Sequence, residues 1–172
     1  MLVHGFGLGV LMRYHSLLPE QEIWKDYGWT CVESVSDELE SVDIVVGSDD
    51  DRTGQDYFHL VDRVRPCWFV YRCDPSLLAQ AEGRHFGLLL MGMANIGYHL
   101  CWRVLDAELF GRPPARHVYL VGYFGEDKDC ASQALFDPFH RNYPFGYRRC
   151  RSVLDWVGYN IMQYDERYYL PW

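Results

Sequence analysis

Three consecutive carboxylates, Asp49, Asp50 and Asp51, occupy the most site-like position in this sequence. They follow residues 42–47, a run rich in valine and isoleucine that predicts a short buried strand ending in Gly47. In open α/β sheets, the loop after the carboxyl end of a strand is where ligands and catalytic groups lie. The function of the chain therefore depends on what this acidic loop does.

The carboxylates allow four interpretations. With Asp56 or His59 they could hold Mg²⁺ or Ca²⁺, which prefer oxygen ligands. Asp51 with His59 or His117 could support hydrolysis. The loop could also be an acidic contact surface for a basic partner, or a solvated segment ahead of a helix N-terminus, where negative charge is mildly stabilising. Because consecutive side chains rarely converge on one ion, the solvated loop is the simplest interpretation, and we expect no metal site.

The composition indicates one globular domain with a large aromatic content. The chain has 172 residues, of which 49% are hydrophobic and 16% aromatic. A formal net charge of -8 argues against a generic nucleic-acid binder held by phosphate contacts. A local basic patch is still available, and its members are Arg112, Arg116, Arg148, Arg149 and Arg151.

The cysteines and the hydropathy pattern favour a reducing compartment. Six cysteines are scattered without a CxxC pair, as is typical of buried free thiols. The apolar start of the chain lacks a basic segment and a cleavage site, and no apolar run approaches the roughly 20 residues of a membrane span. We therefore expect a cytoplasmic or nuclear protein without a signal peptide or a transmembrane segment.

Strands and helices alternate along the chain. Short apolar runs predict strands, and apolar residues at helical spacing predict helices. The expected strands are 29–32, 42–47, 67–71, 99–105 and 118–124, and the expected helices are 56–65, 84–96 and 151–157. Residues 72–75 should form a turn, and residues 125–147 should be mostly irregular. This alternation predicts an α/β fold with a mainly parallel sheet.

Gly5, Gly7 and Gly9 alternate with apolar residues near the start of the chain. Such a stretch could be a nucleotide-binding turn, which should follow a strand and open a helix. Only Leu2 and Val3 precede it, so close backbone packing is the simpler interpretation.

Several blocks, taken in order, resemble a cytosine-5 DNA methyltransferase. Residues 42–48 resemble the strand before that family's Pro-Cys nucleophile loop, and residues 69–78 resemble the segment that carries its Glu-Asn-Val motif. Residues 97–113 resemble the next strand and loop. Arg116 and the apolar residues after it resemble the strand that follows the family's Gln-x-Arg-x-Arg motif, and residues 165–170 resemble the stretch before its target-recognition region.

The resemblance covers residues 40–124 and again 150–170. It implies a truncated Rossmann-like methyltransferase core that lacks the target-recognition lobe. Residues 1–172 would form a single methyltransferase-like domain. Its parts would be a reduced cofactor-site region (1–41), a core resembling the catalytic motifs (42–124) and an aromatic-rich C-terminal segment (125–172).

This sequence departs from the family at the residues of the chemistry. Asp51 stands at the place of the nucleophilic cysteine, Arg72 at the place of the glutamate and Cys73 at the place of the asparagine. Pro114 replaces the glutamine of the arginine motif, of which Arg116 is kept. Since a carboxylate is a poor nucleophile toward cytosine and arginine cannot act as an acid, these departures predict a pseudoenzyme without catalytic residues.

Two further expectations concern charge and cofactor. Arg72 could form an ion pair with Asp49 or Asp51 and so fill the former pocket. The family's S-adenosylmethionine site uses a Phe-x-Gly-x-Gly turn and an acidic residue after its second strand. The matching candidates here are Gly5, Gly7, Gly9 and Glu33. They match imperfectly, so we expect no bound cofactor, with S-adenosylmethionine as the alternative.

We therefore predict an inactive methyltransferase-like protein that acts as a structural or regulatory interaction module. It would be either a subunit of a larger assembly or a modulator of an active methyltransferase. The alternative is a protein that binds S-adenosylmethionine or DNA. A protein partner or a second copy would bind the aromatic C-terminal surface, unless that tail folds back onto the core. The surface comprises Tyr143, Phe145, Tyr147, Trp156, Tyr159, Tyr164, Tyr168, Tyr169 and Trp172.

Overall fold

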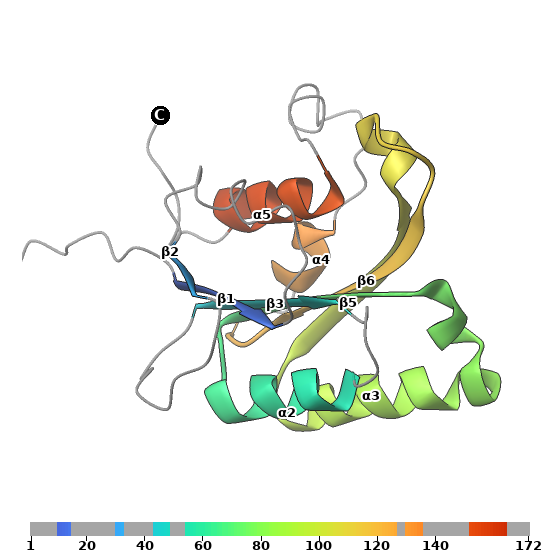
Figure 1. Cartoon of the computed structure of the whole chain (residues 1–172). Helices are drawn as coiled ribbons and strands as arrows, with labels where there is room; N and C mark the ends of the chain where they lie inside the picture. Colours follow the sequence, from blue (N-terminus) through green and yellow to red (C-terminus); the bar gives the residue numbers. More distant parts are fainter. Residues whose placement is uncertain are drawn as a thin grey trace, which may run out of the picture.

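The computed structural model describes residues 10–14, 30–32, 43–48, 54–126, 130–135 and 152–164. These residues form three layers, with one sheet between two pairs of helices (Figure 1). One face is covered by α2 (Gly54–Val64) and α3 (Arg84–Asn95), and the other by α4 (Cys130–Ala134) and α5 (Val153–Tyr164). Within these ranges, no helix is both long and apolar enough to cross a membrane.

The sheet has the strand order β2-β1-β3-β4-β6-β5. Neighbours among β1 to β4 pair in parallel, whereas β6 is antiparallel to both β4 and β5, so β5 runs in the same direction as β4. The predicted α/β fold with a mainly parallel sheet is confirmed. The strands are β1 (Val10–Tyr14), β2 (Thr30–Val32), β3 (Ile44–Ser48), β4 (Trp68–Cys73), β5 (His99–Asp106) and β6 (Arg116–Tyr123).

Helix α2 is fixed to the sheet by Tyr57. Its hydroxyl lies 3.0 Å from the carbonyl oxygens of Val45 on β3 and Val70 on β4, and the side chain is 2% exposed. Burial raises the pKa of this phenol well above its ordinary value, so it stays a neutral donor. The ring also lies where a side chain on Gly47 would be, which explains the glycine in this strand.

On the opposite face, α5 buries a second cluster of apolar side chains against the sheet. Trp156, Val157 and Ile161 are fully buried there, and Asn160 Nδ2 donates to the Ala134 carbonyl at 3.0 Å. Trp156 therefore does not belong to an exposed aromatic surface, and that part of the prediction is wrong. This part of the tail folds back onto the core. The side chains of the other predicted members of that surface lie outside the described residues.

The sequence misplaced several element boundaries. β4 continues through Arg72 and Cys73, which the sequence assigned to a turn, because both residues pair with β6. β1 was not predicted, since its first residues belong to the glycine-rich stretch. Helix α5 is longer than predicted, and α4 lies in the segment expected to be mostly irregular.

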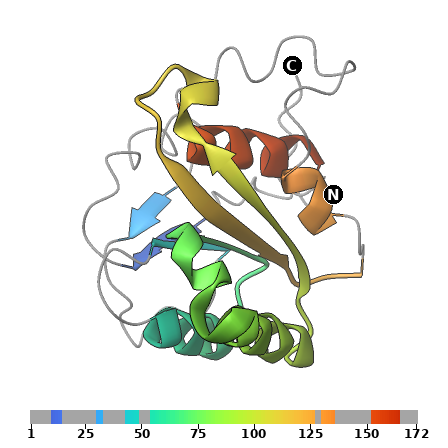
Figure 2. The ribbon, with the colours of Figure 1, turned by 90° about the vertical axis from the view of Figure 1, so that its right-hand side faces the viewer.

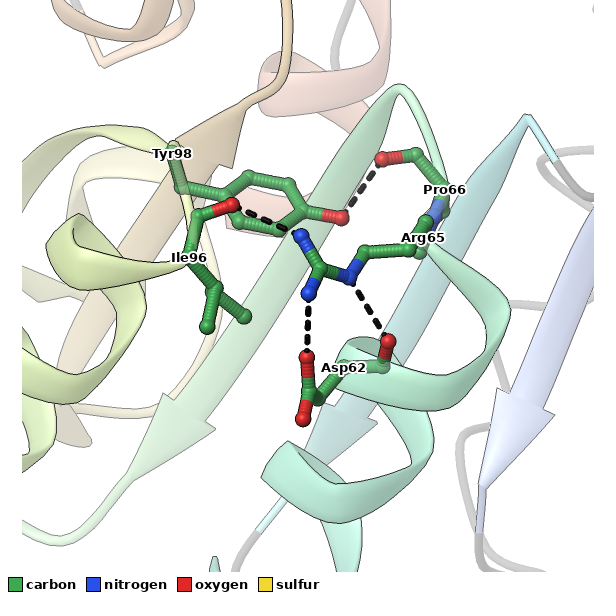
Figure 3. Close-up of polar contacts among 5 residues, drawn as sticks. All are labelled: Asp62, Arg65, Pro66, Ile96 and Tyr98. Atoms are coloured by element: carbon green, nitrogen blue, oxygen red, sulfur yellow. Dashed lines mark hydrogen bonds and ion pairs between the residues drawn. The ribbon is translucent and has the colours of Figure 1, made fainter.

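The edge at which β4 and β5 begin, here called the amino edge, is closed by polar contacts (Figure 3). Arg65, with a φ of 51°, ends α2, and its Nη1 donates to the Ile96 carbonyl at 2.8 Å. Its Nε donates to the Asp62 carbonyl and its Nη2 pairs with the Asp62 carboxylate, both at 2.8 Å. Tyr98 Oη donates to the Pro66 carbonyl at 2.7 Å. These contacts tie the ends of α2 and α3 to the starts of the two strands.

Candidate functional site

The opposite edge of the sheet is here called the carboxyl edge. Those sequence-predicted site residues that the structure describes lie at this edge, namely Arg72, Cys73, Pro114 and Arg116. β3, β4 and β5 end there, and the antiparallel β6 begins there. Ser48 pairs with Arg72, Cys73 pairs with Val118, and Asp106 pairs with Arg116. Figure 2 views the molecule from the side of β5, with the yellow turn between β5 and β6 at the upper left. Ligands of α/β sheets bind at an edge of this kind.

Arg72 and Cys73 point to opposite faces of the sheet, as consecutive strand residues must. Arg72 is half-buried, with a buried Nε, and lies in register between Ser48 and Tyr119. Cys73 is 2% exposed and belongs to the apolar cluster beneath α2 and α3. A thiol in that position cannot reach a nucleotide at the edge without rearrangement of the core.

The acidic loop formed by Asp49, Asp50 and Asp51 lies outside the described residues. In the sequence they directly follow Ser48, the last residue of β3, which pairs with Arg72. The ion pair between Arg72 and Asp49 or Asp51 stays a prediction.

Asp74 begins the connection after β4. Its Oδ1 accepts a hydrogen bond from the Ser76 amide at 2.8 Å and caps the 3-10 helix η1 (Pro75–Leu78). The side-chain and backbone hydrogen bonds from Ser76 lower the pKa of Asp74, and the charge of His117 acts in the same direction. Asp74 is thus an ionised cap at the same edge.

The connection between β5 and β6 is organised by Asp106. Its Oδ1 accepts from the amides of Glu108 and Ala115, each at 3.1 Å, and its Oδ2 accepts from Arg116 Nε, also at 3.1 Å. The backbone bond from Glu108, followed by those from Ala115 and Arg116, lowers the pKa of Asp106. Pro114 is exposed in the same loop.

Sequence reasoning singled out Arg116 but missed Asp106. The available signal was an aspartate at the end of a strand before a Gly-Arg-Pro-Pro loop, since aspartate side chains often bind backbone amides two residues ahead. Its contact with Arg116 depends on strand pairing across ten residues, which sequence spacing alone does not show.

The predicted cofactor residues fall outside the described ranges. β1 begins at Val10, after Gly5, Gly7 and Gly9, whereas a nucleotide-binding turn should follow a strand. Glu33 directly follows β2, at the carboxyl end of a strand parallel to β1. Its position fits the family's acidic residue, and all four assignments stay predictions.

Metal and hydrolase chemistry receive no support from the described residues, which contain no group of three side chains able to hold a metal ion. His59 is exposed on α2. His117 is half-buried on β6, and its ring lies against Tyr119 with centroids 6.4 Å apart. Of the predicted basic patch, Arg112 and Arg116 are exposed at the carboxyl edge, and Arg148, Arg149 and Arg151 lie outside the described ranges.

The fold and this edge define an α/β protein with its candidate site at the carboxyl ends of the central strands. Residues 47–167 match the family of C-5 cytosine-specific DNA methylases, and the chain belongs to that family. It is similar to Type II methyltransferase M2.BsuMI of Bacillus subtilis (strain 168), with 30% identity over 91 residues. It is also similar to Type II methyltransferase M.MthTI of Methanothermobacter thermautotrophicus, with 32% identity over 81 residues.

These alignments cover 48% and 45% of this chain but only 23% and 24% of the two relatives. The chain thus spans about a quarter of the length of the relatives it matches. Members of the family use S-adenosylmethionine as methyl donor.

The comparisons correct the prediction that the chain is not an enzyme. That prediction rested on Asp51, Arg72 and Cys73 at positions where the family has catalytic groups. The family is one of DNA methylases and both relatives are named methyltransferases, which contradicts the non-enzyme prediction. Missing groups at individual positions do not by themselves show that the activity is lost.

Proposed function

We propose that this chain works in the methylation of cytosine at C5 in DNA, as the core of a methyltransferase. The family match over residues 47–167 carries this proposal, because it begins at the end of β3 and continues through β4, β5, β6 and α5. Of the strands that meet at the carboxyl edge, β4, β5 and β6 therefore lie wholly within the matched stretch, and β3 contributes its last two residues, Gly47 and Ser48.

S-adenosylmethionine is the proposed methyl donor, bound beyond the carboxyl ends of β1 and β2. These two strands are parallel neighbours, and Glu33 follows β2 where a carboxylate could accept hydrogen bonds from ribose hydroxyls. The bound donor would supply an activated methyl group.

The reaction needs a thiolate that adds to C6 of cytosine. Among the cysteines whose side chains are described, Cys73 is buried in the core and Cys67 lies at the amino edge. Cys101 lies within β5, and burial raises the pKa of its thiol, which disfavours the thiolate. None of these three thiols is placed for attack at the carboxyl edge.

We therefore propose that the chain is a subunit of a larger assembly, in which a second polypeptide supplies the thiolate and the acid. The matching positions in this chain carry Asp51 and Arg72, whose charges suit neither role. The aromatic C-terminal surface predicted from the sequence, without the buried Trp156, is the proposed contact for that polypeptide.

Duplex DNA with 5-fluorocytosine at candidate sites tests both parts of the proposal. The enzyme is released from C6 only after the C5 hydrogen has left as a proton. Fluorine at C5 cannot leave in this way, so the DNA stays covalently bound to the nucleophile. We expect the native assembly, supplied with S-adenosylmethionine, to methylate ordinary duplexes and to become covalently attached to the fluorinated ones. Mass spectrometry of the attached peptide identifies the chain that carries the thiolate.

The results separate the two claims. Attachment to a second polypeptide supports the subunit role, and attachment to a cysteine of this chain contradicts it while leaving the methyltransferase function in place. An assembly that contains this chain and transfers no methyl group to cytosine contradicts the proposed function itself.

A further inference from the structure

Asp106 holds Arg116 in one orientation while leaving most of the arginine exposed. The carboxylate is 20% exposed, and two backbone amides, from Glu108 and Ala115, fix its Oδ1. These donors stand near the two ends of the loop between β5 and β6, so the carboxylate cannot turn without opening that loop. Its Oδ2 binds Arg116 Nε at 3.1 Å, although the arginine side chain is 76% exposed.

An exposed arginine ordinarily samples many rotamers, and a ligand must immobilise it on binding. Here the guanidinium is held through Nε, and its two Nη groups are the donors that a phosphate accepts from bidentately. The ion pair itself adds little stability at such exposure. The arrangement is better suited to orienting the guanidinium than to stabilising the fold.

We propose that Asp106 is a positioning residue that orients Arg116 toward a phosphate oxygen of DNA. This inference rests on the proposed function, because it takes DNA as the substrate. Arg116 makes the contact, and Asp106 acts only through Arg116.

When this carboxylate is neutralised, a purely electrostatic effect and a positioning effect predict opposite changes in DNA affinity. Asp106 is an acid beside the proposed path of a polyanion, so neutralising it should strengthen DNA binding if only Coulomb interactions matter. If Asp106 orients Arg116, neutralising it should weaken binding instead.

The main variant is Asp106→Asn, which keeps an oxygen for the Glu108 and Ala115 amides but removes the acceptor for Arg116 Nε. Its matched control is Glu108→Gln, which removes one negative charge from an exposed side chain in the same turn. A third variant, Arg116→Lys, keeps the positive charge and the loop but lacks Nε. Arg116→Ala removes the contact altogether.

Fluorescence anisotropy of a short labelled duplex, titrated with the full chain over a series of KCl concentrations, measures binding. We expect Asp106→Asn and Arg116→Lys to weaken binding about 3- to 10-fold, from the freedom regained by one long side chain. Glu108→Gln should bind as tightly as the unmodified chain or slightly more tightly. Arg116→Ala should lower the slope of log affinity against log salt by about one.

Thermal unfolding of each variant verifies that it is folded, and Arg116→Lys keeps the test decisive if Asp106→Asn unfolds. The inference is overturned if Asp106→Asn binds DNA as tightly as the unmodified chain while Arg116→Ala binds weakly. If Asp106→Asn does not fold, the same result for Arg116→Lys overturns it. In either case the proposed function stands. Equal weakening by Asp106→Asn and Glu108→Gln overturns the inference as well. Absence of salt-sensitive binding by the unmodified chain also overturns the inference, whereas the proposed function fails only if the native assembly transfers no methyl group to cytosine.

Discussion

The two edges of the sheet carry similar polar residues with different surroundings. At the amino edge, Arg65 uses Nε, Nη1 and Nη2 in contacts with Asp62 and Ile96. At the carboxyl edge, Arg116 is held at Nε by Asp106 and is 76% exposed. Arg65 therefore links the ends of two helices, whereas Arg116 is fixed at Nε and its side chain is exposed to solvent. The difference shows that the Arg65 guanidinium is used within the fold, whereas the Arg116 guanidinium is left exposed for the binding role proposed above.

The packing behind the carboxyl edge should tolerate the least change. Gly47→Ala places a methyl group into the ring of Tyr57 and should lower the free energy of unfolding by about 1–3 kcal/mol, because β3 and α2 must separate. The control is Gly87→Ala in α3, where a methyl group meets no neighbour and should raise stability by about 0.5–1 kcal/mol. Urea denaturation of both variants measures the two effects, and a loss of equal size in both would refute the packing argument.

Loss of a single hydroxyl at the amino edge should lower the stability of the fold. Tyr98→Phe removes the donor to the buried Pro66 carbonyl and should lower the free energy of unfolding by about 1–2 kcal/mol. DNA binding should not change, since this edge lies at the other end of the strands. Weaker DNA binding in a folded Tyr98→Phe variant would contradict the division between the edges.

The stabilising contribution of the Asp106 hydrogen bonds should depend on pH. Because the folded-state pKa of Asp106 is lowered, its stabilising contribution is present above the unfolded pKa and is lost as the pH falls through the folded pKa. The stability difference between the unmodified chain and Asp106→Asn should therefore be largest near neutral pH and shrink below about pH 4. Denaturation curves over a pH series test this, and a difference that stays constant down to pH 2 would disagree with it.

The smallest effect is expected at the exposed arginine itself. Arg116→Ala should change the free energy of unfolding by less than about 0.5 kcal/mol, because an exposed ion pair contributes little. A large loss of stability would show that Arg116, like Arg65, is structural. The contrast between the two edges would then disappear.

The sequence predicted the central elements well and their arrangement less well. Short apolar runs located β3 and β4, and helical spacing located α2 and α3, because each of these patterns is local. β1 was missed, since a short strand beside a glycine-rich stretch has little pattern of its own. Arg72 and Cys73 were placed in a turn, whereas pairing with β6 keeps them in the strand.

Residue identities at the carboxyl edge also led to one wrong conclusion. Asp51, Arg72 and Cys73 differ from the family's catalytic residues, and the chain was predicted not to be an enzyme. The family match and the named methyltransferases contradict that conclusion. A substitution at one position shows which group is missing there, but not whether another chain supplies it.

The sequence by itself determined the α/β class, the main strands and helices, and the family resemblance over residues 40–124 and 150–170. These properties follow from side-chain type and spacing along the chain. Only the tertiary structure decided that β6 lies between β4 and β5 and that Cys73 is buried. It also decided that Asp106 holds Arg116. The reason is physical: strand order, burial and ion pairing depend on which distant segments share an edge, and a linear sequence does not specify that locally.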